Sequence, residues 1–91
     1  MKLRWRPMAL ADRERIARYI AAEGSPMAAR KLDAEIVQKA QAAAQRPKLY
    51  RVGRIRGTRE MVVRPTYVMV YRIQAEAIEI LRVLHAAQQW P

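Results

Sequence analysis

The spacing of apolar residues changes once along this chain, at Pro47. Before it, apolar residues recur every three or four positions, as at Ile16, Tyr19 and Ile20, and this is the period of an amphipathic α-helix. After it, β-branched residues occur in short runs with the two-residue period of a β-strand. A chain with this order is expected to form an α+β fold, with a layer of helices on one face of a sheet.

Two helices are expected in the first half of the chain. The first covers residues 8–22, and the second runs from residue 26 to about residue 45. Between them, Gly24 suits a helix C-terminus and Ser25 suits an N-cap, with Pro26 in the first turn of the second helix. Because this connection is short, the helices are expected to pack as an antiparallel hairpin.

The strands are expected to form a small, twisted and mostly antiparallel sheet. A short strand over residues 2–5 precedes the helices and alternates polar with apolar residues. Residues 49–57 are basic and extended. Three further strands, joined by hairpins, are expected over residues 58–63, 66–73 and 77–84.

Composition excludes several classes of protein. The 91 residues suffice for a single domain, residues 1–91. There is no cysteine, which excludes disulfides and thiolate metal sites and fits a reducing cytoplasm. The N-terminal residues lack the apolar run of a signal peptide, and no apolar run approaches the roughly 20 residues of a membrane span. With a single histidine, neither a metal nor another cofactor is expected.

The net charge of +10 is concentrated in one part of the chain. Residues 46–72 carry eight basic side chains and one acidic one, whereas residues 1–45 carry nine and five. Such a charge favours anionic partners, which can be nucleic acid or an acidic protein. The first of these segments is therefore the candidate surface for binding a target or an anion. Its candidate residues are Lys48, Arg51, Arg54, Arg64 and Arg72.

Four arginines lie within nine residues of this segment, at positions 51, 54, 56 and 59. They could stabilise a phosphorane-like transition state without a metal, hold a phosphate passively or bind a carboxylate-rich partner. They could also form a solvated edge that discourages strand-to-strand aggregation. The sequence leaves these alternatives open. The local GRIRG run is not a P-loop, because the Gly-Lys-Ser/Thr ending is absent.

His85 is the only histidine, and it falls where the last strand is expected to end. It could act as a general acid or base, or it could simply hydrogen-bond the backbone at a strand end. The second interpretation is favoured, because no second histidine and no Ser-His-Asp or Cys-His arrangement is visible. In a regular strand, Arg82 and His85 point to opposite faces, so a bulge or turn near Leu84 would be needed to bring them together.

Five segments, taken in order, resemble the RelE/ParE superfamily of toxins from bacterial type II toxin–antitoxin modules. They are LRW, SPMAARKL, RPKLYRVGRIRGTREMVV, YVMVYRI and IEILRVLHAAQQWP. The resemblance covers nearly the whole chain and implies a helical hairpin on a small twisted antiparallel sheet. It also implies an antitoxin whose C-terminal segment wraps the toxin, and the charge predicts that this antitoxin is acidic. The complex is expected to bind operator DNA through the antitoxin.

The superfamily has two kinds of target, and the resemblance slightly favours one of them. RelE-like members cleave messenger RNA in the ribosomal A site without a metal, whereas ParE-like members inhibit DNA gyrase. Val68 stands where RelE-like toxins tend to carry a catalytic arginine, and this favours the ParE-like subgroup. His85 matches a histidine that is catalytic in some RNA-cleaving relatives, but the same Leu–His pair also occurs in ParE-like toxins.

The resemblance assigns different roles to the same residues under each alternative. In a ribonuclease, Arg56, Arg59 and Arg82 would hold the scissile phosphate, and His85 would protonate the leaving 5′ oxygen. In a gyrase inhibitor, the same basic surface would serve for docking, and His85→Ala would have almost no effect. A third alternative is a chain that still binds its antitoxin but inhibits no target.

Overall fold

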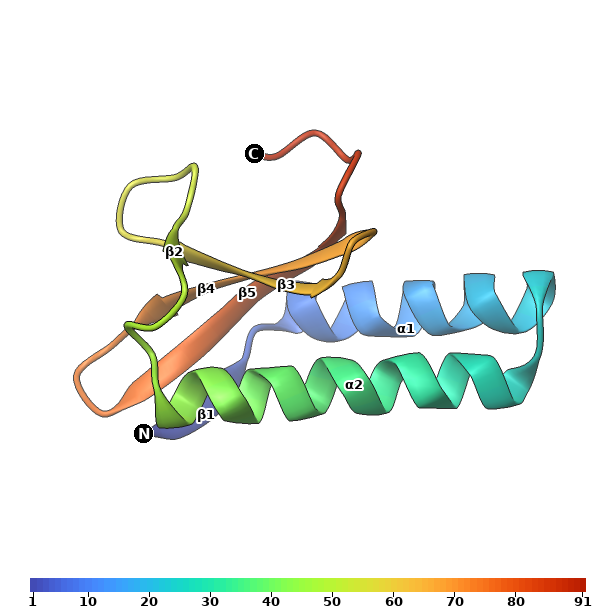
Figure 1. Cartoon of the computed structure of the whole chain (residues 1–91), viewed down its shortest axis with the longest axis horizontal. Helices are drawn as coiled ribbons and strands as arrows, with labels where there is room; N and C mark the ends of the chain where they lie inside the picture. Colours follow the sequence, from blue (N-terminus) through green and yellow to red (C-terminus); the bar gives the residue numbers. More distant parts are fainter.

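The computed structural model describes all 91 residues and contains two helices and five strands. In chain order these elements are β1 (Lys2–Trp5), α1 (Pro7–Glu23), α2 (Pro26–Gln45), β2 (Arg51–Val52), β3 (Arg59–Arg64), β4 (Tyr67–Ile73) and β5 (Ala77–His85). Both helices lie on one side of the sheet (Figure 1). The strand order is β1-β5-β4-β3-β2, and only the pair β1–β5 is parallel. The expected α+β fold is therefore confirmed.

The helical hairpin forms where the local sequence signals place it. The Ser25 hydroxyl accepts a hydrogen bond from the Ala28 N–H at 3.0 Å and caps α2, with a proline in its first turn. Helix α1 extends one residue beyond the expected range at each end. Arg13 of α1 donates two hydrogen bonds of 2.9 Å to Asp33 of α2, and its guanidinium lies 4.5 Å from the centroid of the Trp5 ring. This arginine links both helices to β1.

The main core lies between the helices and the sheet. It consists of Leu32 and Ile36 from α2 and of Met69 and Tyr71 from β4, among other apolar residues. The Tyr71 ring is fully buried, and its hydroxyl donates a 2.5 Å hydrogen bond to the Pro47 carbonyl. This bond holds the chain where it leaves α2 and turns toward β2, and thereby positions the basic segment.

Strand β5 departs from regular alternation at Leu81. Val70 pairs with Arg82 and Tyr71 pairs with Ile80, so Leu81 has no partner on β4 and forms a bulge. Regular alternation would place Ile80 and Arg82 on one face, but the bulge puts them on opposite faces, and Ile78, Ile80 and Val83 reach the main core. The bulge precedes Arg82, so the strand stays regular from there to His85.

No helix in the structure is both long enough and apolar enough to cross a membrane.

Candidate functional site

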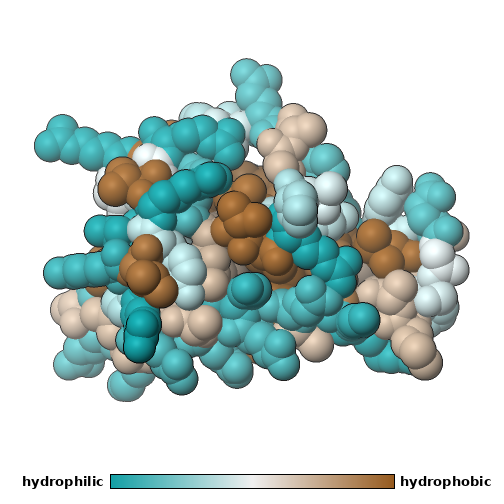
Figure 2. Space-filling model, viewed as in Figure 1, coloured by the Kyte–Doolittle hydropathy of each residue, from teal (hydrophilic) through white to brown (hydrophobic).

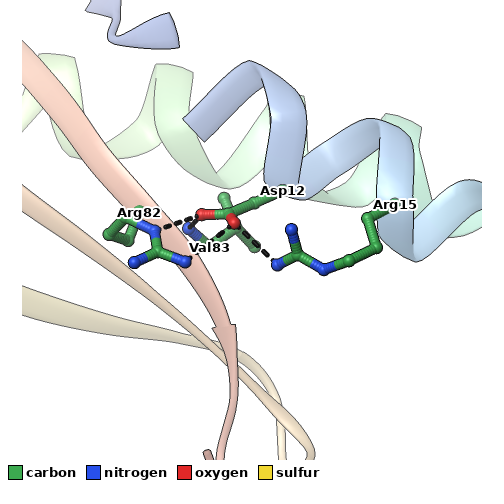
Figure 3. A network of polar contacts seen from close by, with 4 residues as sticks. All are labelled: Asp12, Arg15, Arg82 and Val83. Carbon is green, nitrogen blue, oxygen red and sulfur yellow. Dashed lines mark hydrogen bonds and ion pairs between the residues drawn. The ribbon is translucent and has the colours of Figure 1, made fainter. Parts of the chain in front are cut away.

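A buried carboxylate joins α1 to the last strand. Strand β1 pairs with β5 only as far as Ile80, which leaves the rest of this edge of β5 without a neighbouring strand. Asp12, whose exposed fraction is 1%, accepts a 2.9 Å hydrogen bond from the Val83 N–H on this edge. It also accepts hydrogen bonds of 2.7 and 3.0 Å from Arg82, and one of 2.7 Å from Arg15. Figure 3 shows the two guanidinium groups on either side of the Asp12 carboxylate.

The electrostatics of this network keep Asp12 ionised. Burial by itself would raise the pKa of the carboxyl group, but the three donors outweigh burial and hold the pKa below its ordinary value. The same hydrogen bonds raise the pKa of Arg82, whose guanidinium also lies 5.6 Å from the centroid of the Trp90 ring. The Arg82 guanidinium is therefore held by Asp12 within the fold, and the Arg82 side chain is only 16% exposed.

A second buried carboxylate organises the basic segment. Glu60 of β3 is 3% exposed and accepts hydrogen bonds from Arg51 Nη2 at 3.1 Å, from the Arg54 N–H at 2.9 Å and from Arg54 Nε at 3.2 Å. Burial would raise the pKa of Glu60, but these donors lower it overall. One carboxylate thus fixes both β2 and the loop that follows it.

The remaining predicted anion-binding residues divide into paired and unpaired ones. Arg64 forms an ion pair with Glu35 of α2, and Arg72 donates to Glu79 at 2.8 Å. Arg59 donates to two backbone carbonyls, those of residues 48 and 50, at 3.3 and 2.8 Å. Lys48 and Arg56 are exposed and form no ion pair. Among the candidates, these two are the ones whose side chains have no partner within the protein.

His85 lies at the end of β5, against Tyr67. The two ring centroids are 5.6 Å apart in an edge-to-face arrangement. The Nδ1 atom of His85 accepts a 3.1 Å hydrogen bond from the Ala87 N–H, so the neutral ring carries its proton on Nε2. The backbone hydrogen bond expected for a histidine at a strand end is therefore present.

The structure does not bring together the four residues that a ribonuclease would use. In the register of the sheet, Arg59 lies opposite Tyr71 and His85 lies opposite Tyr67, four residues apart along β4. Four residues along a strand correspond to about 13 Å. Arg56, in the loop before β3, lies on the Arg59 side. Arg82 points to the face of β5 opposite to that of His85, as the sequence predicted.

His85 instead opens into a groove between α1 and the end of the β3–β4 hairpin. The groove has a volume of about 450 Å³. Its floor is apolar and its rim is basic, with Arg15 on α1 and Arg64 on β3. The lining residues are Arg15, Ile16, Tyr19, Ile20, Arg64, Thr66, Tyr67, Val83, His85 and Gln88. Figure 2 shows apolar side chains enclosed by hydrophilic ones on the face it presents.

Sequence reasoning missed the two carboxylates that hold these arginines in place. Asp12 interrupts the stripe formed by Ala9 and Ile16, so an acidic residue at a buried helix position was the available signal. Glu60 is the single acidic residue among the eight basic ones of residues 46–72. No group of three or more histidine, aspartate or glutamate side chains is arranged to hold a metal ion.

The helical hairpin on a small sheet and the arginine-rich strand–loop segment are the architecture expected of the RelE/ParE superfamily, and comparison with known proteins identifies the family. The model described as "ParE toxin of type II toxin-antitoxin system, parDE" matches residues 3–90. The chain therefore belongs to the ParE toxin family of type II toxin–antitoxin modules. The superfamily and the favoured subgroup expected from the sequence are both confirmed.

Two relatives support this assignment. The chain is 41% identical over 91 residues to "Putative toxin Y4kP" of Sinorhizobium fredii (strain NBRC 101917 / NGR234), an alignment that covers 99% of this chain and 93% of that protein. It also superimposes on a solved structure described as "Chromosomal ParDE TA system from P. aeruginosa" with a TM-score of 0.85. That match covers 93% of this chain and 95% of the other at 23% identity, and it shows the shared fold.

Proposed function

We propose that this toxin stops bacterial growth by inhibiting DNA gyrase in the cytoplasm and that an acidic antitoxin neutralises it. The observation that carries the proposal is the match of the ParE family over residues 3–90, because ParE-like toxins are the gyrase-inhibiting branch of the superfamily. On this proposal the toxin is a binding protein that needs no acid–base chemistry of its own.

The arrangement of the basic residues supports docking over catalysis. A general acid must reach the leaving oxygen while other groups hold the same phosphate, so the participating side chains must converge. Here the β4 partners of Arg59 and His85 lie four residues apart along the strand, and Arg82 is bound to Asp12. The basic side chains form an extended surface that suits a large anionic or acidic partner.

Ribosome-dependent cleavage of messenger RNA is the second candidate, and one observation favours it. His85 shares its groove with Arg15 and Arg64, so a histidine and two cations face one hollow. Such a set could protonate a leaving group and hold a phosphate without a metal. Both arginines are already bound to carboxylates, Asp12 and Glu35, which reduces the positive charge available to a phosphate.

We further propose that the antitoxin occupies this groove. Its floor includes Ile16, Ile20 and Val83, and its rim carries the two arginines described above. An amphipathic segment would bury apolar surface here, and acidic residues along its edges would meet the exposed parts of these arginines, whose side chains are 53% and 37% exposed although each is bound to a carboxylate. The toxin–antitoxin complex would then bind its operator DNA through the antitoxin.

A paired assay on toxin freshly released from its antitoxin tests the proposal. One arm measures DNA supercoiling and cleavage-complex formation by gyrase, and the other measures cleavage of a message on programmed ribosomes. We expect loss of supercoiling, intact messages and no effect of His85→Ala in the gyrase arm. Cleaved messages, with cleavage reduced about 100-fold or more by His85→Ala, would instead establish a ribonuclease. Activity in neither arm would leave a chain that only binds its antitoxin.

A further inference from the structure

The loop between β2 and β3, residues 53–58, has a fixed shape. The Gly53 N–H donates to the Thr58 carbonyl at 2.8 Å, and the Thr58 hydroxyl and N–H both donate to the Ile55 carbonyl, at 2.6 and 3.0 Å. Gly57 adopts a φ of 83°, a conformation that favours glycine. Hydrogen bonds within the chain therefore fix both ends of the loop, and Gly57 allows its turn.

Glu60 holds the first arginine of this loop in place. Its buried carboxylate binds both the backbone N–H and the side-chain Nε of Arg54. Glu60 is also the only acidic residue between positions 46 and 60, where six residues are basic, so the segment has a net charge of +5. Because Glu60 is buried in β3 and residues 53–58 contain no acidic residue, the surface of the loop presents basic side chains and no carboxylate.

The arginines of the loop remain accessible. The Arg54 side chain is 47% exposed even while bound to Glu60, and Arg56 is exposed and forms no ion pair. The loop projects from the sheet on the side away from the helices (Figure 1). It therefore presents two guanidinium groups, that of Arg54 held by Glu60 and that of Arg56 unpaired, to any surface that approaches this side of the molecule.

The composition of the loop fits a phosphate backbone better than a protein surface. Protein interfaces depend on buried apolar or aromatic anchors, and the loop offers only Ile55, which is half-buried. Two exposed apolar residues, Leu49 and Val52, lie nearby but before the loop, and are not part of it. Phosphate contacts require positive charge and well-placed donors, and a guanidinium can bind a phosphate with two parallel hydrogen bonds.

We propose that the β2–β3 loop binds the phosphate backbone of double-stranded DNA, with Arg56 as a direct contact and Glu60 as the residue that positions Arg54. The inference rests on the proposed function, because gyrase holds a DNA duplex where the toxin acts. The contact is expected to be independent of sequence, since contacts to phosphate groups carry no sequence information.

The test measures toxin binding to a fluorescently labelled DNA duplex of mixed sequence, without gyrase, over a series of salt concentrations. Neutralising one phosphate contributes a slope of about −0.9 to a plot of log K against log salt. We expect Arg56→Ala to make this slope less steep by about 0.9, the contribution of one phosphate contact. Arg56→Lys keeps the positive charge and is expected to retain most of the wild-type slope. Arg30→Ala is the matched control, since Arg30 is an exposed, unpaired arginine on α2.

Glu60→Gln tests the positioning role. This variant removes one negative charge, which by itself would strengthen DNA binding at all salt concentrations. If Glu60 positions Arg54, the variant weakens binding instead, and its effect shrinks when Arg54→Ala is already present. Circular dichroism and thermal unfolding show whether each variant is folded at the temperature of the assay.

Two results would overturn the inference. One is an equal change of slope for Arg56→Ala and Arg30→Ala, which would reflect net charge alone. The other is that Arg56→Ala loses as much affinity for a polyglutamate peptide as for DNA. That result would make an acidic protein the partner of the loop. Failure of the proposed function is separate: a toxin that binds DNA through the loop but leaves gyrase active would contradict gyrase inhibition only.

Discussion

At the scale of single residues, the stability of the toxin is expected to depend on Asp12. Asp12→Ala would leave the Arg82 guanidinium and the Val83 N–H without their shared acceptor in a buried place. Removing one partner of a buried ion pair costs about 3–5 kcal/mol, because the other charge stays buried and uncompensated. We expect a loss near the lower end of this range, since Arg82 is partly exposed, measured as the free energy of unfolding in urea.

An exposed ion pair on the same helix provides the control. Arg18 and Glu14 are 2.9 Å apart, but both side chains are about 70% exposed. Glu14→Ala is expected to change the free energy of unfolding by less than about 1 kcal/mol. Similar losses for the two variants would show that the Asp12 network has no special role.

The partner of Asp12 could not have been predicted from the sequence. The helical stripe marks Asp12 as a buried acidic residue, but its partner lies 70 positions further along the chain. Such a pairing depends on where β1 stops along β5, and this is a property of the assembled sheet. For the same reason the sequence identified Arg82 as a candidate phosphate ligand without showing that a carboxylate already binds it.

At the scale of elements, the shape of the β2–β3 loop is expected to depend on Gly53. A Cβ atom at this position would lie 2.2 Å from Thr58 Oγ1 and 3.1 Å from the Thr58 carbonyl. Thr58 cannot turn away without losing its hydrogen bond to Ile55. Gly53→Ala is therefore expected to reduce the free energy of unfolding by about 1–3 kcal/mol, as measured by urea denaturation.

Gly24 provides a comparison at the other glycine whose φ is not positive. There a Cβ atom would meet only the Ile20 carbonyl, at 3.4 Å. Gly24→Ala should destabilise the fold less than Gly53→Ala, because its Cβ would meet no atom closer than this ordinary contact distance. Equal effects of the two substitutions would contradict the tight closure of the loop.

The bounds of the helices and of β1, β3, β4 and β5 were predicted to within one residue, but the faces of β5 beyond Leu81 were not. Capping residues and apolar spacing are encoded within each helix, and α1 and α2 begin and end within one residue of the expected positions. The bulge at Leu81 depends on how β5 pairs with β4, and it shifts the face of every later residue. Alternation along a single strand cannot reveal it.

At the scale of the whole molecule, the layered architecture followed from the change of apolar period, but the positions of the basic residues did not. The charge of residues 46–72 marked this region as a candidate binding surface. It could not show that Glu60 and Glu79 bind three of these arginines or that the β4 partners of Arg59 and His85 lie four residues apart. The clustering of basic residues in the sequence therefore predicted a basic surface, but not which of their side chains are close enough together to form a site.

Four carboxylates with lowered pKa values make the whole fold sensitive to acid. They belong to Asp12, Glu35, Glu60 and Glu79. A carboxyl group whose pKa is lower in the folded state stabilises the fold while it is ionised, and this contribution disappears as pH falls through the folded value. The ordinary values are 3.8 for aspartate and 4.5 for glutamate. Stability should therefore be nearly constant from neutral pH to about pH 5 and fall steadily below it.

Urea denaturation from neutral to acidic pH measures this dependence, and Glu60→Gln isolates one contribution to it. The buried Glu60 is expected to contribute more than the partly exposed Glu35 and Glu79, whose ion pairs are screened by solvent. The variant should be less stable than the wild type at neutral pH and should lose less stability on acidification. Repulsion within a strongly basic chain also grows in acid, but it acts on both proteins. If the wild type and Glu60→Gln lose the same stability on acidification, charge repulsion, and not protonation of Glu60, causes the loss.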